Sequence, residues 1–288
     1  MSQPQPDLTT PPTAPLANRT RRSASIPRRL VAEGKYHLLP VYALLTTSDL
    51  AREGIRNSGS FRFADHIYRN EPSGRFGVGR VLDRVLLRLK GARSMRSRFL
   101  HSRLEVLRAI ESVSPDRRVT IVSIPCGIAR DLFDVAETLR RADLERYQTA
   151  RFVGIDLDPE PIALSRELTR GHGCFEFTCG DALQPGTIPA GVDVIVSLGF
   201  GEFLADGTLF DFYRRCLSAL KPGGRFITSA MNRDRLSDYL ARELAELHTH
   251  YRSAQQLRAL LTSAGFVRVR ATRDSVGLQT LAVAEKGQ

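Results

Sequence analysis

From residue 119 onward, short apolar segments rich in β-branched residues alternate with longer segments of helical periodicity. This alternation predicts a doubly wound α/β fold with a seven-stranded, mainly parallel sheet. The last two predicted strands are joined by a short connection without a helix, so they are expected to form an antiparallel hairpin at one edge of the sheet. The predicted strands are 119–124, 151–156, 174–178, 192–198, 225–230, 266–271 and 278–284. The predicted helices lie at about 129–146, 160–170, 206–220 and 235–263.

The region before this core has a different periodicity. Apolar residues recur at helical spacing within 38–45, 78–89 and 99–110, and basic residues occupy the other faces. Segment 60–74 contains several aromatic residues and a Pro-Ser-Gly sequence, and is interpreted as a loop. We therefore expect an α-helical subdomain over residues 31–118, which would act as a lid or substrate-binding part, in front of a core over residues 119–288.

Positive charge is concentrated at the start of the chain. The formal net charge is +11, yet residues 119–288 contribute only −1, from 20 basic and 21 acidic residues. Residues 31–118 contribute +8, from 17 basic and 9 acidic residues. Residues 1–30 are rich in Pro, Ser, Thr and Arg and are predicted to be a disordered basic arm. The charge favours an anionic partner, although 38 Arg against 4 Lys also indicate an Arg-rich proteome.

Several classes of protein and site are not expected. No apolar run approaches the ~18 residues of a membrane span, and the N-terminal arm lacks the apolar core of a secretory signal, so a cytoplasmic protein is predicted. His248 and His250 have no third ligand nearby in the sequence, so no metal site is predicted. The cysteines show neither C-x-x-C pairs nor zinc-ligand spacing and are expected to be buried reduced thiols. They are Cys126, Cys174, Cys179 and Cys216.

Residues suited to ligand binding directly follow the predicted strands, where sheets of this kind bind their ligands. Gly127 lies in the loop after the first strand and allows the backbone to approach a ligand closely. Asp156 follows the second strand and suits the two hydroxyls of a ribose, since a carboxylate accepts two hydrogen bonds. Asp181 follows the third strand and suits an exocyclic amine. Segment 197–202 after the fourth strand is a glycine-bearing rim with one acidic residue, Glu202.

Five motifs in this order resemble the class I S-adenosylmethionine-dependent methyltransferases. They are the loop with Cys126 and Gly127, V-G-I-D-L-D-P at 153–159, G-D-A at 180–182, L-K-P-G-G at 220–224 and A-G-F at 264–266. The resemblance implies a Rossmann-like methyltransferase core over residues 119–288, with S-adenosylmethionine as cofactor. By this resemblance, Asp156 would bind the ribose, Asp181 and Ala182 the adenine, and loop 125–129 the methionine part. The full set of predicted cofactor-binding residues is Pro125, Cys126, Gly127, Ile128, Ala129, Asp156, Leu157, Asp181, Ala182, Leu198 and Gly199.

The cofactor loop departs from the pattern of the family it resembles. That pattern is acidic-x-G-x-G-x-G, whereas here Ser123, Pro125 and Ala129 replace the acidic residue and the two outer glycines. Asp131, one turn into the next predicted helix, is a candidate to replace the missing acid. The C-G-I-A-R-D sequence is more similar to the C-G-x-A-R-E loop of some bacterial methyltransferases, including ones thought to make fatty-acid methyl esters. We therefore predict a bacterial protein.

Methyl transfer from a sulfonium is an in-line displacement, so alignment and exclusion of water are the main tasks of the protein. A base helps when the acceptor is a hydroxyl or a protonated amine. Glu202, His66 and Tyr68 are the candidate catalytic residues. The alternatives are that Glu202 is a carboxylate at a helix start and that His66 only forms hydrogen bonds within its segment.

Three functions remain open from the sequence. The first is methylation of a small molecule, anionic or lipid-like, under the helical lid. The second is RNA methylation through the basic N-terminal region, although rim 197–200 lacks the Asn/Asp-Pro-Pro-aromatic motif of enzymes that methylate base amines. The third is a catalytically inactive cofactor-binding module for interactions, because only one loop glycine is left.

Overall fold

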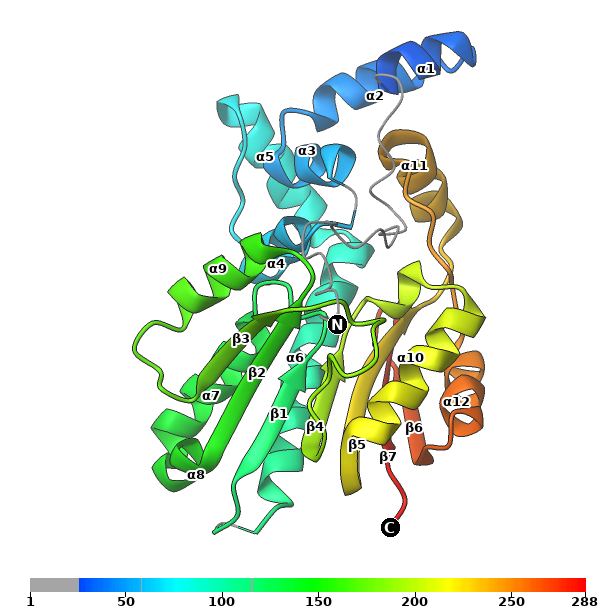
Figure 1. Ribbon diagram of the computed structural model, residues 1–288. Helices are drawn as coiled ribbons and strands as arrows, with labels where there is room; N and C mark the ends of the chain where they lie inside the picture. The colour runs from blue at the N-terminus through cyan, green and yellow to red at the C-terminus, as the bar shows by residue number, and fades with distance from the viewer. Residues whose placement is uncertain (1–25, 58, 115) are drawn as a thin grey trace, which may run out of the picture.

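The computed structural model describes residues 26–57, 59–114 and 116–288. Its centre is a seven-stranded sheet with the order β3-β2-β1-β4-β5-β7-β6 (Figure 1). The first five strands are parallel to one another, and β7 is antiparallel to both β5 and β6, as predicted. The strands are β1 Val119–Ser123, β2 Ala150–Asp156, β3 Phe175–Cys179, β4 Val192–Ser197, β5 Leu220–Met231, β6 Val267–Arg273 and β7 Gln279–Glu285.

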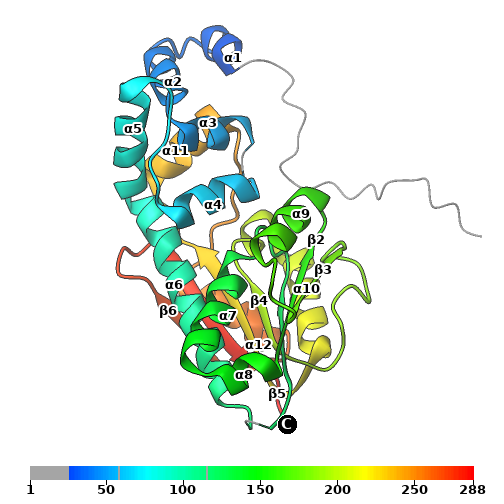
Figure 2. The same ribbon diagram turned by 90° about the vertical axis from the view of Figure 1, so that its left-hand side faces the viewer.

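Helices cover both faces of the sheet. Every residue of β1 and β4 is buried, which explains why these central strands are continuous apolar runs. One face carries α6 Lys90–Glu111, α7 Arg130–Ala142, α8 Leu144–Thr149 and α9 Pro159–Leu168. The other face carries α10 Asp206–Ala219 and α12 Ala254–Ser263 (Figure 2). Helix α6 was expected in the N-terminal subdomain, but its second half packs on the sheet through Val106, Ala109 and Ile110.

The remaining helices form a separate layer beyond the carboxyl ends of the parallel strands (Figure 1). We call this layer the lid. Helix α11 reaches it from the C-terminal half of the chain, where Leu244 is buried against Ile26, Leu30 and Ile55. The lid therefore combines two distant segments, and a boundary at residue 118 does not delimit it. Its helices are α1 Ile26–Ala32, α2 Leu38–Leu45, α3 Asp49–Arg56, α4 Phe61–Arg69, α5 Phe76–Arg88 and α11 Arg235–Ala245.

The interpretation of segment 60–74 as a loop is wrong, because most of it is helix α4. Ser60 caps this helix by accepting a hydrogen bond from the Phe63 backbone N–H. Asn70 ends it in the left-handed conformation, which asparagine tolerates better than most residues. The Pro-Ser-Gly sequence that suggested a loop lies after this end, and aromatic residues are compatible with a helix that packs on both sides.

Two long predicted helices are each divided into two. Asp143 ends α7 and caps α8 by accepting from the Arg146 backbone N–H. Glu246 ends α11 in the left-handed conformation, and α12 begins at a capping box in which Ser253 and Gln256 bond reciprocally.

Two further expectations need correction. Residues 26–30 were assigned to a disordered arm, but they belong to α1, where Ile26 and Leu30 are buried; the rest of that predicted arm lies outside the described residues. All four cysteines are free, but only Cys126 and Cys216 are buried, and Cys179 is exposed. None of the helices in the described part of the chain has the length and hydropathy that a membrane-spanning segment needs.

Candidate active site

Loop 125–129 is held by hydrogen bonds from its backbone N–H groups to β2 and α9. The Cys126 N–H donates to the Ile155 carbonyl at 2.9 Å, and the Gly127 N–H donates to Asp156 Oδ2 at 2.8 Å. The Ala129 N–H donates to Ser165 Oγ at 3.0 Å. Only Gly127 in this loop has a positive φ, +52°, so the single remaining glycine stands where the backbone requires one. The outer glycines of the family pattern are therefore dispensable for this turn.

Asp156 lies at the end of β2. One of its carboxylate oxygens accepts a hydrogen bond from the cofactor loop, and the other accepts one from the turn that follows β2. Its Oδ1 accepts from the Asp158 backbone N–H at 3.0 Å. Burial raises the pKa of Asp156 above its ordinary value, and the backbone N–H groups of Asp158 and Gly127 counteract this rise. Each carboxylate oxygen keeps a second lone pair for a ribose hydroxyl. Asp158 itself caps α9 by accepting from the Glu160 backbone N–H.

Asp181 carries an oxygen that no described residue satisfies. Its Oδ1 accepts from the Leu183 backbone N–H at 2.8 Å, whereas its Oδ2 is buried without a hydrogen-bond partner in the described part of the chain. An unpaired buried carboxylate oxygen is costly, and a ligand donor would remove that cost. The exocyclic amine of an adenine is such a donor. Ala182 beside it is buried and suits the flat face of a base. These residues fit the adenosyl part of S-adenosylmethionine.

A second acid lies near the loop, in the first turn of α7. Burial raises the pKa of Asp131 to about 6, although the Leu132 backbone N–H donates to its Oδ1. Burial, followed by the negative charges of Asp156 and Asp131, raises the pKa of the Cys126 thiol. Asp131 comes two residues after loop 125–129, which keeps it a candidate to receive a cationic group such as the ammonium of the cofactor.

Helix α4 of the lid crosses directly over the cofactor loop. A Cβ atom added at Gly127 would lie 3.4 Å from Cβ of Phe61. One turn later, Asp65 accepts from Arg130 Nε at 2.6 Å, which ties α4 to the start of α7. An ion pair between Arg62 and Glu160 ties it to the start of α9. The helix that sequence reasoning missed is therefore the roof of the cofactor loop.

Two of the predicted catalytic residues meet at a buried arginine. Arg98 of α6 donates to the Tyr68 hydroxyl at 2.9 Å and to Glu202 Oε1 at 3.1 Å. It also donates to Gln279 Oε1 at 3.4 Å. Burial raises the pKa of Glu202, and the positive charge of Arg98 opposes this rise. Glu202 lies in the short 3₁₀ turn η1 Gly201–Phe203. No sequence pattern indicated Arg98, which is one of many arginines in its region.

The guanidinium of Arg98 also lies against the rim after β4. A Cβ atom added at Gly199 would lie 3.1 Å from Arg98 Nη1, so the glycine at this position lets the arginine approach. Leu198 packs against the core cluster between the sheet and α7. The structure therefore brings the predicted rim residues and the predicted catalytic pair Tyr68 and Glu202 to one place.

The third predicted catalytic residue, His66, points elsewhere. Its Nε2 contacts Asp83 Oδ2 at 2.7 Å. Asp83 is completely buried and also accepts from Ser48 Oγ, at 2.6 Å, and from the Leu50 and Ser73 backbone N–H groups. Although burial raises it, the pKa of Asp83 is held below its ordinary value by these hydrogen bonds. His66 thus belongs to a hydrogen-bonded cluster around Asp83 that holds α3, α4 and α5 together.

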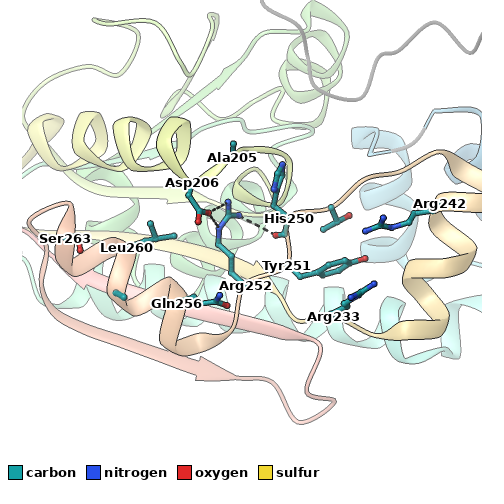
Figure 3. Close-up of a pocket in the computed structure, with 12 residues that line it drawn as sticks. Ala205, Asp206, Arg233, Arg242, His250, Tyr251, Arg252, Gln256, Leu260 and Ser263 are labelled. Carbon is teal, nitrogen blue, oxygen red and sulfur yellow. Dashed lines mark hydrogen bonds and ion pairs between the residues drawn. The ribbon is translucent and has the colours of Figure 1, made fainter.

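A cavity of about 830 Å³ lies between the start of α10 and segment 249–263 (Figure 3). The His250 backbone N–H donates to the Glu202 carbonyl at 2.8 Å. The buried Arg252 donates to the Gly201 and Leu204 carbonyls, both at 2.6 Å, so the cavity wall fixes the η1 turn. Its lining residues are Ala205, Asp206, Arg233, Arg242, Thr249, His250, Tyr251, Arg252, Gln256, Ala259, Leu260 and Ser263.

The basic side of this cavity is organised by one buried acid. Arg233 Nη2 donates to Asp238 Oδ2 at 2.9 Å, and Arg242 Nε donates to Asp238 Oδ1 at 2.8 Å. Figure 3 shows these two arginines on either side of Tyr251, whose hydroxyl donates to the same carboxylate at 3.1 Å. Each guanidinium keeps further N–H groups for an anion. No motif in the sequence indicated this cavity. Across the described ranges, no group of three or more His, Cys, Asp or Glu side chains is arranged to hold a metal ion.

Comparison with known proteins now decides the family. The family model described as "Putative methyltransferase" matches residues 41–286. The chain belongs to this methyltransferase family. The match extends through the lid as well as the core, and the class I S-adenosylmethionine-dependent methyltransferase expected from the strand-end motifs is confirmed. Its cofactor is S-adenosylmethionine.

A curated relative agrees with this assignment over part of the chain. It is named "Probable S-adenosylmethionine-dependent methyltransferase", comes from Mycolicibacterium smegmatis and is 31% identical over 125 residues. The match covers 43% of this chain and 47% of that protein. The chain therefore spans about half the length of this relative.

Solved structures share the fold. A possible exported protein from Bordetella parapertussis has a TM-score of 0.76 at 22% identity, covering 91% of this chain and 93% of that one. The carbon methyltransferase CurJ has a TM-score of 0.58 at 14% identity, covering 91% and 71%. Magnesium protoporphyrin IX methyltransferase from Synechocystis has a TM-score of 0.54 at 13% identity, covering 83% and 98%. The cytoplasmic location and the bacterial origin expected from the sequence stay predictions.

Proposed function

We propose that this protein transfers the methyl group of S-adenosylmethionine to an anionic, lipid-like small molecule bound beneath the lid. The observation that carries the proposal is the position of α4, which lies over the cofactor loop and is tied down on both sides by Asp65–Arg130 and Arg62–Glu160. A roof held in this way excludes water from the transfer. It is a poor surface for an RNA stem.

The residues of the chain divide the work of binding and alignment. Asp181 and Asp156 would hold the adenosine of the cofactor, and Asp131 its ammonium. S-adenosylmethionine supplies an electrophilic methyl group. A carboxylate acceptor brings its own lone pair, so its oxygen can form the new C–O bond while the C–S bond breaks, and no proton has to move. The contribution of the protein is then alignment and exclusion of water.

Arginines near the rim support an anionic acceptor. Arg98 is buried, contacts Glu202 and Tyr68, and keeps its Nε without a partner in the described part of the chain. Arg233 and Arg242 line the neighbouring cavity. For a hydroxyl acceptor, Glu202 is the proposed base, since burial raises its pKa. His66, bonded to Asp83, would position the lid.

The first test is cofactor binding by isothermal titration with the full chain. We expect S-adenosylmethionine to bind, and Asp156→Ala to weaken binding at least tenfold, because the variant loses a charged hydrogen-bond acceptor. Asp211→Ala, which removes an exposed acid on α10, is the matched control and should bind normally. Absence of binding at millimolar cofactor would contradict the enzyme.

The second test identifies the acceptor class. The chain is incubated with methyl-labelled S-adenosylmethionine and either a series of short- and long-chain carboxylic acids or total transfer RNA. We expect label in solvent-extractable methyl esters. With the best acid, the double variant Arg233→Gln/Arg242→Gln should raise KM more than it lowers kcat, because it removes binding and not alignment. Label recovered in the RNA would overturn the small-molecule proposal.

A further inference from the structure

Helix α5 exposes a strip of apolar side chains along its outer face. Val78, Val81 and Val85 follow one another at helical spacing and are 53%, 57% and 49% exposed. Leu89, directly after the helix, continues the strip at 52% exposure. Residues spaced by three and four lie on one side of a helix. The strip is therefore continuous over the length of α5.

This strip is not an unfilled part of the lid interior. The side of α5 that faces α2, α3 and α6 consists of other residues, namely Gly79, Asp83 and Leu87, which are buried. Figure 2 shows α5 along the outer edge of the molecule, above α6. The exposed valines thus form a second apolar side on a helix whose packing is already satisfied.

A row of arginines lies beside the apolar strip. Arg80, Arg84 and Arg88 follow one another at intervals of four residues and are all exposed. Arg75 and Arg93, also exposed, stand beyond the two ends of the helix. In the described part of the chain, none of these five forms an ion pair or a side-chain hydrogen bond, whereas Arg62, Arg69 and many others do. The nearest acid in the sequence, Asp83, is buried and turned inward.

We propose that this docking face binds the surface of an anionic phospholipid bilayer. It consists of the apolar strip Val78, Val81, Val85 and Leu89 with the arginines Arg75, Arg80, Arg84, Arg88 and Arg93. A helix that carries apolar side chains on one face and cations beside them lies in the headgroup region, with the apolar side chains at the acyl boundary and the cations on the lipid phosphates.

Two other partners use only half of the docking face. An RNA would pair with the arginines but would leave the apolar strip in water. A second copy of this chain would cover the apolar strip but would bring two rows of unpaired arginines together. An anionic bilayer satisfies the valines and the arginines at once. It would also bring the roof of the cofactor site to the source of lipid-like molecules, but the proposal does not depend on the chemistry of that site.

The test is co-sedimentation of the full chain with vesicles of phosphatidylcholine, alone or mixed with phosphatidylglycerol. We expect binding only to the mixed vesicles, weakening as ionic strength rises. The triple variant Arg80→Gln/Arg84→Gln/Arg88→Gln should lower the partition coefficient about fivefold per arginine, roughly a hundredfold in all. The double variant Val81→Ser/Val85→Ser should lower it about tenfold at constant charge.

A matched triple variant removes the same charge elsewhere. Arg118, Arg214 and Arg258 are exposed on the core, and their replacement by Gln should leave vesicle binding within about twofold, since screening limits the reach of exposed charges. Equal losses in the two triple variants would overturn the proposal, because the attraction would then be a property of the whole chain. Binding of a labelled RNA that the Arg variant abolishes and the Val variant keeps, without vesicle binding, would assign the face to RNA.

Self-association provides the remaining outcome. If sedimentation velocity shows a dimer that Val81→Ser/Val85→Ser dissociates, and vesicles do not bind, the docking face belongs to a second copy. All replaced side chains are exposed, so titration with S-adenosylmethionine should be unchanged in each variant and serves as the folding control. A chain that docks on vesicles but transfers no methyl group would contradict the proposed function alone, and the reverse result would contradict the docking face alone.

Discussion

The lid and the strand-end edge of the core each contain a buried carboxylate oxygen, but the two carboxylates differ in how completely they are hydrogen-bonded. In the lid, Asp83 accepts from Ser48, Leu50, Ser73 and His66. At the core edge, Asp181 has a buried oxygen without a partner in the described residues. A satisfied buried carboxylate stabilises the fold, whereas an unsatisfied one is a cost that a ligand can remove. Hydrogen-bond satisfaction thus separates Asp83 from Asp181 within one molecule.

The largest effect expected from this contrast is on Asp83. Asp83→Ala leaves two backbone N–H groups and a hydroxyl without their acceptor, so we expect the free energy of unfolding to fall by about 3 kcal/mol. Because the pKa of Asp83 is lowered in the folded protein, its stabilisation is present above the pKa of the unfolded chain and is lost as pH falls through the folded pKa. Chemical denaturation measures the change.

Glu71→Ala is the control for this measurement. It removes an exposed acid from the same region of the lid, where Glu71 pairs with Arg69. Exposed ion pairs contribute little, so the expected loss is below about 0.5 kcal/mol. If Asp83→Ala lowers the free energy of unfolding by an equally small amount, the hydrogen-bonded cluster around Asp83 does not hold the lid together.

Asp131 tests the core edge by its pH dependence. Burial raises its pKa from 3.8 to about 6, so the folded protein binds this proton more tightly than the unfolded chain does. Stability conferred by the protonated form is then lost as pH rises between these two values. Asp131→Asn should stabilise the cofactor-free protein by as much as ~3 kcal/mol at neutral pH and have little effect below both values. Chemical denaturation at neutral pH and at a pH below 3.8 measures this difference.

The same variant should also bind S-adenosylmethionine more weakly, if Asp131 receives the ammonium. If Asp131→Asn stabilises the protein but does not weaken cofactor binding, then Asp131 does not bind the cofactor and is only a buried acid whose charge is unfavourable. Asp134→Asn, one turn later on α7, is the matched control, because that acid already pairs with Arg103.

The core was predictable because each of its elements carries a local signal. Buried parallel strands are apolar runs, and the residues that bind ligands directly follow them, as Asp156 and Asp181 do. The capping box at Ser253 and Gln256 was also legible in the sequence and could have placed the start of α12. The short gap at Asp143 was harder, since an aspartate within a helical pattern does not by itself end a helix.

The lid was less predictable because the arrangement of its helices depends on contacts between residues that are far apart in the sequence. Arg98 meets Glu202 only after the sheet is formed, and α11 joins the lid from the other half of the chain. Helix α4 is short and aromatic, and its stability comes from packing over the cofactor loop more than from its own propensity. Asp181 was indicated by its place after a strand, whereas no sequence pattern indicated that Asp83 is buried and fully hydrogen-bonded.

Asp181 provides the converse of the Asp83 experiment. Asp181→Ala should weaken S-adenosylmethionine binding about tenfold, because it removes the acceptor for the adenine amine. The same change should leave the free energy of unfolding of the cofactor-free protein within about 1 kcal/mol, because losing the Oδ1 hydrogen bond from the Leu183 N–H is offset by removing the unpaired Oδ2. Titration calorimetry and denaturation of one preparation give both values. A large loss of stability with intact binding would reverse the roles assigned to the two carboxylates.

The smallest effect concerns the contact between the two regions. Arg130→Gln removes the ion pair with Asp65, whose side chains are 24% and 14% exposed, and should cost less than about 1 kcal/mol of stability. Its consequence should be local, because α4 loses one of its two ties to the core and opens more often. Hydrogen exchange should therefore rise in residues 61–69 and stay unchanged in β1. Arg141→Gln, on the same helix but far more exposed, should change neither, and equal exchange in both variants would mean that Arg62–Glu160 and packing alone hold the roof.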